Sequence, residues 1–363
     1  MVQKSALWSL TTIVLVSVFA VGPSFGASAL RDKMIAKAKK EKVLVAAGSN
    51  ARELRTKLKG FKKLYPFIKV KAVKGNTSNT INRVVTEAKA NRLTIDLVAI
   101  DDAGCELLAK RGLLTRYEYP HLADFIKGTQ PTHGLYVDLF GNPRVQGVYN
   151  TNMVKPEDVP KNWEEILDPK WKGKTLISRS AEEFPARLAF VWRKKDKLNW
   201  DRAFKFFGKL IDNHKPAIAR GYSGGNQRVA AGEVAIFWFP AIGTAVRLAV
   251  NKKAPVGLIA FPKFPITYRS YGILKGAPNP ASSWLMIDYL TSPEGQFDYT
   301  SRVSAKSALN KKAKLGKLAK WMNDNGATNI NGDLSNPTLT SKVYTEKVLK
   351  KSENWYFKKL GIK

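Results

Sequence analysis

Two kinds of hydrophobic pattern alternate along residues 42–108. Short apolar or alternating runs predict strands at residues 43–48, 68–73 and 95–100. Between these runs, apolar residues recur at helical spacing over 54–65, where Pro66 ends the pattern, and again over 81–88. Repeated strands and helices indicate a parallel sheet covered by helices, which is an α/β fold.

A second set of α/β units begins after a strand-like run at residues 144–150. Asn162 and Glu165 have the spacing of a capping box, so a short helix is expected before Asp168. Further along, the pattern predicts strands at 175–178 and 234–239, a helix at 200–213, a turn at 220–226 and a short helix at 227–232. Ser292 followed by Pro293 predicts the start of another helix.

The length of the chain favours two lobes over one, because a single hydrophobic core seldom grows to this size. We expect lobe 1 to comprise residues 30–145, with residues 255–300 returning to it. Lobe 2 is expected to comprise residues 146–254, with C-terminal helices from 301–363 packing on it. Hydrophobic residues make up 44% of the chain, which excludes a disordered protein.

The N-terminus predicts export. Lys4 precedes an apolar run from Ala6 to Gly22, and small residues end at Ala29, which is typical of a signal peptide over residues 1–29. An uncleaved membrane anchor is the alternative, although the run is short for a span. The mature protein is therefore expected in the periplasm.

The chain is strongly basic. It carries 61 Lys and Arg against 29 Asp and Glu, a formal net charge of +32, and such a surface attracts anions. The basic residues are scattered among helices with an apolar face, as on a solvated surface. We therefore expect no dedicated nucleic-acid binding.

Few residues suggest catalysis or a metal. Cys105 is the single cysteine and lies in a helical apolar pattern, as a buried structural thiol would. The three histidines lack metal-ligand spacing, and no nucleophile, base or paired-carboxylate arrangement is evident. No enzyme activity, metal or cofactor is predicted.

Three segments in this order resemble one family. They are "YNTNMVKPEDVPKNWEEILDPKWKGK", "AAGEVAI" and "GAPNPASSWLMIDYLTSPEGQ". Behind a signal peptide, they resemble the extracellular solute-binding proteins of ABC importers, most closely the iron(III)-type branch. The resemblance implies a type II periplasmic-binding fold, in which two α/β lobes, each a mixed sheet flanked by helices, are joined by two hinge crossings. It also implies a ligand cleft between the lobes and delivery of the solute to an ABC permease in the inner membrane.

The ferric ligand set of that branch is not evident. The resemblance implies a pair of adjacent tyrosines shortly after "AAGEVAI", yet no tyrosine lies between Tyr222 and Tyr268. A ferric ion prefers anionic oxygen ligands, and the phenylalanines and tryptophan found there supply none.

Candidate ligand contacts lie in loops at the ends of the strands. In an open α/β sheet the ligand lies at the carboxyl edge, near helix N-termini. We expect Arg144, at the crossing, to pair with an oxyanion. The full candidate set is Ser49, Asn50, Asn76, Thr77, Ser78, Asp101, Arg144, Tyr222, Ser223, Gly224, Trp238 and Tyr268. Arg269 follows Tyr268 where the chain returns to lobe 1.

The sequence thus predicts a monomeric carrier of a small organic anion, such as a carboxylate, phosphate ester or phosphonate. Two alternatives stay open. One is a carrier of ferric ion or of an iron chelate. The other is an enzyme built on the same two-lobed fold.

Overall fold

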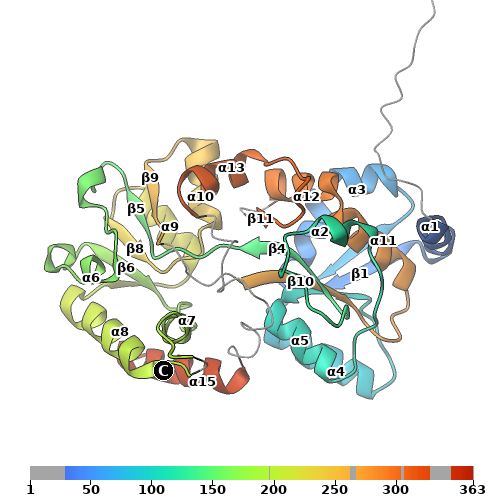
Figure 1. The fold of residues 1–363 in the computed structure, drawn as a ribbon, viewed down its shortest axis with the longest axis horizontal. Helices are drawn as coiled ribbons and strands as arrows, with labels where there is room; N and C mark the ends of the chain where they lie inside the picture. The colour runs from blue at the N-terminus through green and yellow to red at the C-terminus, as the bar shows by residue number, and fades with distance from the viewer. Residues whose placement is uncertain (1–28, 196, 262–266, 304–305, 328–344, 363) are drawn as a thin grey trace, which may run out of the picture.

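Two β-sheets, each with its own helices, form two lobes side by side (Figure 1). The computed structural model describes residues 29–195, 197–261, 267–303, 306–327 and 345–362. The predicted signal segment lies almost wholly outside these residues. Among the described helices, none is both long and apolar enough to cross a bilayer.

The sheet of lobe 1 has six strands in the order β11-β4-β10-β3-β1-β2. Its strands are β1 (Val43–Ala47), β2 (Lys69–Val73), β3 (Leu97–Asp101), β4 (Val137–Asn142), β10 (Thr267–Ile273) and β11 (Ser307–Ala308). β1 pairs in parallel with both β2 and β3, as the strand–helix repeat predicts. β10 is antiparallel to β3 and β4, so the sheet is mixed.

Helices cover both faces of this sheet. They are α1 (Ala29–Glu41), α2 (Ala51–Lys57), α3 (Lys59–Leu64), α4 (Thr77–Lys89), α5 (Asp102–Lys110), α11 (Pro280–Thr291) and α12 (Pro293–Asp298), with the shorter turns η1 (Pro120–Asp124) and η4 (Tyr299–Val303). Residues 281–291 of α11 are all buried, and most of them are apolar, as expected for a helix packed on every side. Ser292 caps α12 as predicted, because its Oγ accepts the Gly295 N–H at 3.0 Å.

The predicted helix over 54–65 is broken into α2 and α3. The break falls at Leu58, whose ψ of 81° is not helical. After it, the Gly60 N–H donates to the Asp298 carboxylate at 3.1 Å, and a Cβ at Gly60 would lie 2.0 Å from the Tyr289 hydroxyl. Close docking on α11 and α12 therefore replaces a continuous helix.

The sheet of lobe 2 has five strands in the order β7-β6-β8-β5-β9. They are β5 (Gly147–Asn150), β6 (Thr175–Ser178), β7 (Ala217–Ala219), β8 (Ile236–Trp238) and β9 (Val256–Ile259). β6 is parallel to β7 and β8, whereas β5 is antiparallel to β8 and β9.

The helices of lobe 2 come from the middle and the end of the chain. They are η2 (Pro156–Asp158), α6 (Trp163–Ile166), η3 (Pro169–Trp171), α7 (Phe184–Val191), α8 (Trp200–His214), α9 (Tyr222–Ala230), α10 (Gly243–Lys252), α13 (Lys317–Asp324) and α15 (Glu346–Leu360). The capping box forms: Asn162 Oδ1 accepts the Glu165 N–H at 2.9 Å, and Glu165 accepts the Lys161 N–H at 2.8 Å.

The predicted turn over 220–226 is mostly helix, because α9 begins at Tyr222. Gly225 in this segment allows close packing of the helix on the sheet. A Cβ at Gly225 would lie 2.2 Å from the Phe237 ring, so glycine lets α9 lie directly on β8. Three predicted cleft residues consequently form the first turn of a helix.

The paths between the lobes differ in detail from those expected. The chain crosses from β4 to β5 at residues 143–146 and returns between β9 and β10. β9 pairs with β5, so residues 256–259 lie in lobe 2 and not in the returning segment. β11 pairs with β4 in lobe 1, and the chain then reaches α13, which packs in lobe 2 against α10. Residues 307–324 therefore make a third passage between lobes.

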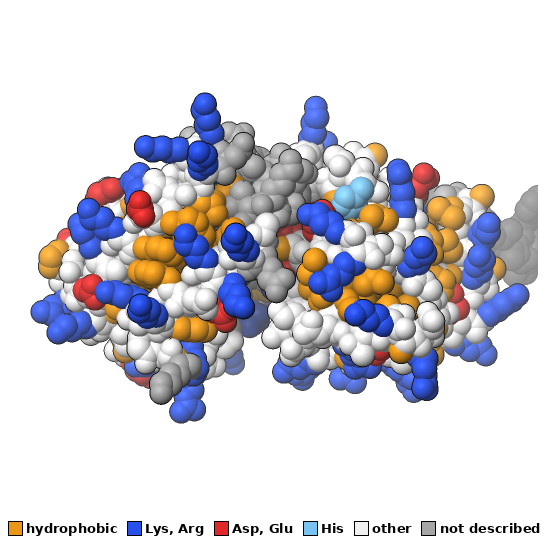
Figure 2. Space-filling model, turned by 90° about the horizontal axis from the view of Figure 1, so that it is seen from below, with side chains coloured by type: hydrophobic (Ala, Val, Ile, Leu, Met, Phe, Trp, Pro, Cys, Tyr) orange, Lys and Arg blue, Asp and Glu red, His pale blue; other side chains and the backbone are white. Residues whose placement is uncertain are grey.

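Lys and Arg side chains are scattered over both lobes on the face shown in Figure 2. Few Asp and Glu side chains interrupt them, and they form no continuous stripe on this face.

Candidate functional site between the lobes

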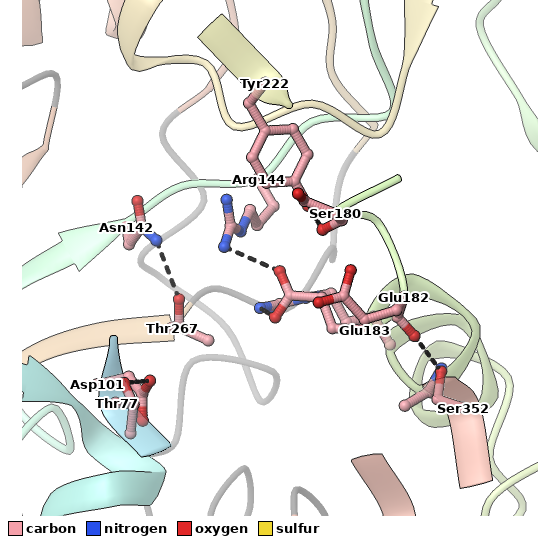
Figure 3. Close-up of polar contacts among 12 residues, drawn as sticks. Thr77, Asp101, Asn142, Arg144, Ser180, Glu182, Glu183, Tyr222, Thr267 and Ser352 are labelled. Carbon is pink, nitrogen blue, oxygen red and sulfur yellow. Dashed lines mark hydrogen bonds and ion pairs between the residues drawn. The ribbon is translucent and has the colours of Figure 1, made fainter. Parts of the chain in front are cut away.

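A cavity of about 100 Å³ lies where the two lobes face each other. From lobe 1 it is lined by Asp101, Asp102, Ala103, Thr267 and Arg269; from lobe 2 and the first crossing it is lined by Arg144, Glu183, Arg187 and Leu349. We call this space the inner chamber. Several of its polar side chains are drawn in Figure 3.

The lobe 1 wall is built where β3 ends and α5 begins. Asp101 caps α5, because its Oδ1 accepts the Gly104 N–H at 2.8 Å. Its other carboxylate oxygen accepts the Thr77 hydroxyl, which joins the start of α4 to the start of α5 (Figure 3). Both helix N-termini are thereby fixed at the carboxyl edge of the sheet.

The loop after β1 approaches this edge through a glycine. Gly48 has a φ of +129°, and a Cβ there would lie 2.2 Å from the Ala99 carbonyl oxygen on β3. Only glycine satisfies both constraints. The close turn places the Ser49 Oγ within 3.4 Å of Arg269 Nη1.

The opposite wall is an arginine–glutamate–arginine group. Glu183 Oε1 lies 2.9 Å from Arg144 Nη2 (Figure 3). Glu183 Oε2 lies 2.8 Å from Arg187 Nη2. The Arg144 side chain is only 9% exposed. Burial alone would raise the pKa of Glu183, but Arg187 and Arg144 outweigh it and lower that pKa to about 2. Glu183 therefore remains an anion at any physiological pH.

Two arginine Nε–H groups at the inner chamber are buried without a hydrogen-bond acceptor among the described residues. They belong to Arg144 and Arg269. A buried charged donor without a partner is unfavourable, and a ligand oxygen is the kind of acceptor that relieves it.

A further cation, Lys306, adds positive charge nearby. Its ammonium donates to the Asn142 side-chain carbonyl. Burial, together with repulsion from Arg269 and Arg144, lowers the pKa of Lys306 well below its usual value. An anion in the site would favour the charged form of this lysine, because opposite charges stabilise each other.

The start of α9 lies near Arg144. The Tyr222 hydroxyl donates to the Ser180 carbonyl, and Tyr222 lies beside the Arg144 guanidinium (Figure 3). The N-cap residue, Gly221, offers no side-chain acceptor to the first N–H groups. Ser223 is exposed and its hydroxyl lies 3.1 Å from the Thr244 hydroxyl.

Buried acids lie behind the lobe 1 wall. Asp102 is 2% exposed, and burial followed by repulsion from Asp101 raises its pKa to about 7. Asp138 on β4 accepts the Ser270 hydroxyl, and burial followed by repulsion from Asp102 raises its pKa as well. With a pKa of about 7, Asp102 is protonated in part at neutral pH, so the chamber is more positive than its composition suggests.

The structure distributes the predicted site residues unevenly. Asp101 and Arg144 line the inner chamber, and Thr77, Ser49 and Tyr222 lie beside residues that do. Two others make bonds within the fold: Asn50 donates to the Tyr299 hydroxyl, and Asn76 caps α4. The remaining three are exposed in the first turns of α4 and α9: Ser78, Ser223 and Gly224.

Two predicted contacts lie in the hydrophobic cores instead of the cleft. Trp238 is fully buried in lobe 2, where β8 pairs with both β5 and β6. Tyr268 is fully buried in lobe 1. Both faces of β8 pack in hydrophobic cores, since Trp238 and its neighbour Phe237 belong to different clusters. On β10, Tyr268 faces the core while its neighbour Arg269 lines the chamber, and the sequence did not establish which face is which.

Six lining residues were not predicted as contacts: Glu183 and Arg187, together with Asp102, Ala103, Thr267 and Leu349. The first two are four residues apart on α7, a spacing that places them on one helix face. That signal is present in the sequence, but many surface ion pairs share it.

The described residues contain no group of three or more His, Cys, Asp or Glu arranged to hold a metal ion. Two tyrosines near the cleft already have hydrogen-bond partners. The Tyr222 hydroxyl donates to the Ser180 carbonyl, and the Tyr299 hydroxyl accepts a hydrogen bond from the Asn50 side-chain amide. Burial followed by repulsion from Glu183 raises the pKa of Tyr222, which disfavours a tyrosinate ligand.

Comparison with known proteins places the chain in a family. The model for "Bacterial extracellular solute-binding protein" matches residues 44–297. Iron uptake protein A1 of Synechocystis sp. is 22% identical over 269 residues, covering 63% of this chain. The match spans 65% of that protein's length.

Solved structures share the fold over most of the chain. A Trichodesmium protein (IdiA, FutA) in complex with iron and citrate has a TM-score of 0.68 and 18% identity, covering 88% of this chain and all of that one. AfuA from Actinobacillus pleuropneumoniae, with exogenous fructose-6-phosphate bound, has a TM-score of 0.65 and 20% identity, covering 88% and 99%. At these identities the likeness establishes the two-lobed fold alone.

Proposed function

The chain belongs to the bacterial extracellular solute-binding proteins, and we propose that it captures a small anion, a phosphate ester or related oxyanion, for an ABC importer. In this proposal the solute lies between the lobes in the periplasm and is passed unchanged to a permease. The protein is a transport component of its family, not an enzyme.

The observation that carries the proposal is the pair of buried Nε–H groups of Arg144 and Arg269 at the inner chamber. Guanidinium groups bind phosphate and carboxylate oxygens through paired hydrogen bonds. Lys306 lies nearby and would take its charged form more readily beside an anion, whereas Glu183 is already paired with two arginines. An anion with several oxygens satisfies more of these donors than a neutral solute.

The volume of the chamber agrees with this chemistry. About 100 Å³ accommodates a single phosphate or carboxylate group but not a whole sugar or peptide. The proposal therefore assigns the chamber to the charged group of the solute.

The test is calorimetric titration with inorganic phosphate, fructose 6-phosphate and citrate. Arg269→Ala should weaken binding of the preferred anion by roughly tenfold or more, since a charge-assisted hydrogen bond is lost in a buried site. Arg202→Ala, a 55% exposed arginine of α8, is the matched control and should bind as the unmodified chain does. Equal affinity in the Arg269 variant and its parent would exclude this site.

Transport of iron as an anionic chelate is the second candidate. The names of the Synechocystis and Trichodesmium proteins favour iron over a plain organic anion, and the citrate in the latter offers an anion that arginines can bind. Adding ferric citrate and, separately, a ferric salt with a weak chelator distinguishes the cases. A visible charge-transfer band in the second arm indicates direct ligation of iron, and a bound but spectrally unchanged ferric citrate indicates the chelate.

A further inference from the structure

A second, larger hollow opens beside the inner chamber. It has a volume of about 610 Å³ and lies between α4 and α5 of lobe 1 and α15 of lobe 2. We call it the outer groove. The two spaces share Asp101, Ala103 and Leu349, so they are adjoining parts of one cleft.

The outer groove differs chemically from the inner chamber. Its lobe 1 side presents the polar side chains of Ser78 and Asn82 next to the apolar side chains of Ile81 and Leu107, whereas the Thr77 hydroxyl is bonded to Asp101. Charged side chains also line the groove: Glu106, Lys110, Arg111, Lys350 and Glu353. A mixed lining of this kind suits the uncharged body of a solute that has both hydroxyl groups and carbon surface. The volume is within the range of small-molecule sites.

The lobe 2 side of the groove is formed by α15, which lies opposite α5 (Figure 1) and is anchored by side-chain hydrogen bonds. Ser352 Oγ donates to the Glu182 carbonyl at 2.6 Å and accepts the Ala186 N–H at 3.0 Å. The Tyr356 hydroxyl donates to the Ser178 carbonyl at 2.5 Å. These bonds tie α15 to the end of β6 and to the segment that carries Glu183.

Leu349 occupies the junction of the two spaces. It is half-buried, because one side packs near Ala186 and Phe190 of α7 while the other lines both hollows. A solute that extends from the inner chamber into the outer groove would therefore pass beside Leu349.

We infer that the outer groove receives the body of the solute and that Leu349 of α15 is a specificity-determining residue. The solute class is then an organic phosphate whose phosphate occupies the inner chamber and whose sugar-sized body lies against α15. This inference rests on the proposed function and adds to it a second subsite and a residue that selects solutes by size.

The experiment compares two probes, inorganic phosphate and fructose 6-phosphate, in calorimetric titrations of the full chain. The first probe fills only the inner chamber, and the second extends beyond it. Because Leu349 lines both spaces, Leu349→Trp should weaken fructose 6-phosphate binding at least roughly tenfold more than it weakens phosphate binding. Lys347→Trp is the control: the same substitution on an exposed position of α15, which does not line the groove, should change neither affinity.

Leu349→Ala guards against a misfolded tryptophan variant. It removes apolar contact without blocking the groove, so it should weaken fructose 6-phosphate binding about threefold or more beyond any change in phosphate binding. Thermal unfolding of each variant reports whether it is folded.

The outcomes separate the two proposals. Equal weakening of both probes in the Leu349 variants, or no change in either, overturns the inference. If the unmodified chain binds inorganic phosphate but not the ester, the inference fails and the anion site stands. If it binds neither probe, the phosphate proposal and the inference fall together.

Discussion

The charge at the inner chamber depends on how each ionisable side chain there is paired and buried. Glu183 is paired with both Arg144 and Arg187. Burial and repulsion from Arg269 and Arg144 lower the pKa of Lys306, and the charge of Glu53 opposes that shift. Partly buried arginines keep their charge, whereas a buried carboxylic acid takes up a proton. The positive potential of the site therefore comes from its arginines, which keep their charge.

Asp102 should make the fold less stable as pH rises. Its folded-state pKa of about 7 is above the unfolded value near 3.8, so the folded state holds the proton more tightly. Its contribution is fully present below about pH 4 and is lost as pH rises through about 7. Asp138, whose pKa is also raised, acts in the same direction.

Asp102→Asn should remove much of this decline, because asparagine does not ionise. The free energy of unfolding in urea is measured at pH 5 and at pH 8 for both proteins. The loss of stability from pH 5 to pH 8 should be smaller by about 2 kcal/mol in the variant than in its parent. Asp201→Asn, at an exposed position in the first turn of α8, is the control. The same pH dependence in the Asp102 variant and the parent would contradict the assignment.

At the scale of elements, the C-terminal helix is a structural part of lobe 2. It packs on α7, and its Lys359 reaches Asp212 of α8 at 2.7 Å. The bond network of Ser352 and Tyr356 places its first turns at the cleft. An element at the very end of the sequence therefore borders the candidate site.

Ser352→Ala should loosen this helix. The substitution leaves the buried Ala186 N–H and the Glu182 carbonyl without their side-chain partner, which costs about 1–3 kcal/mol. Chemical denaturation measures the loss. Thr86→Ala, which removes an exposed hydroxyl bonded within α4, should cost less than about 0.5 kcal/mol. Equal stabilities of the two variants would show that α15 is not anchored in this way.

At the scale of the whole molecule, the candidate site lies where the chain passes between lobes. Arg144 belongs to the first crossing, and Thr267 and Arg269 follow the second. A ligand held by both lobes favours the arrangement in which both contact it. The scattered positive charge of the whole chain acts at longer range and brings anions toward this region.

The association rate of fructose 6-phosphate should therefore fall with salt. The screening length decreases from about 10 Å at 0.1 M to about 3 Å at 1 M, which shields the surface lysines more than the buried arginines. Stopped-flow measurements from about 0.05 to about 0.5 M NaCl should show a several-fold decrease in the association rate. The dissociation rate should change less. A salt-independent association rate would exclude long-range attraction.

The sequence by itself determined the α/β class, most strand positions and several helix caps, because periodicity and capping depend on residues near one another in the chain. Asn162 and Ser292 are such cases. It also predicted Asp101 and Arg144 at the cavity, since strand ends and crossings are local features.

Only the tertiary structure decided which charges meet. Arg144, Glu183 and Arg269 come from three distant segments, and no local pattern distinguishes them from the many solvated lysines and arginines. The same is true of Trp238 and Tyr268, whose burial depends on strand faces and neighbours far away in sequence. The sequence specifies each element through short-range preferences, whereas the site arises from side chains that only packing brings together.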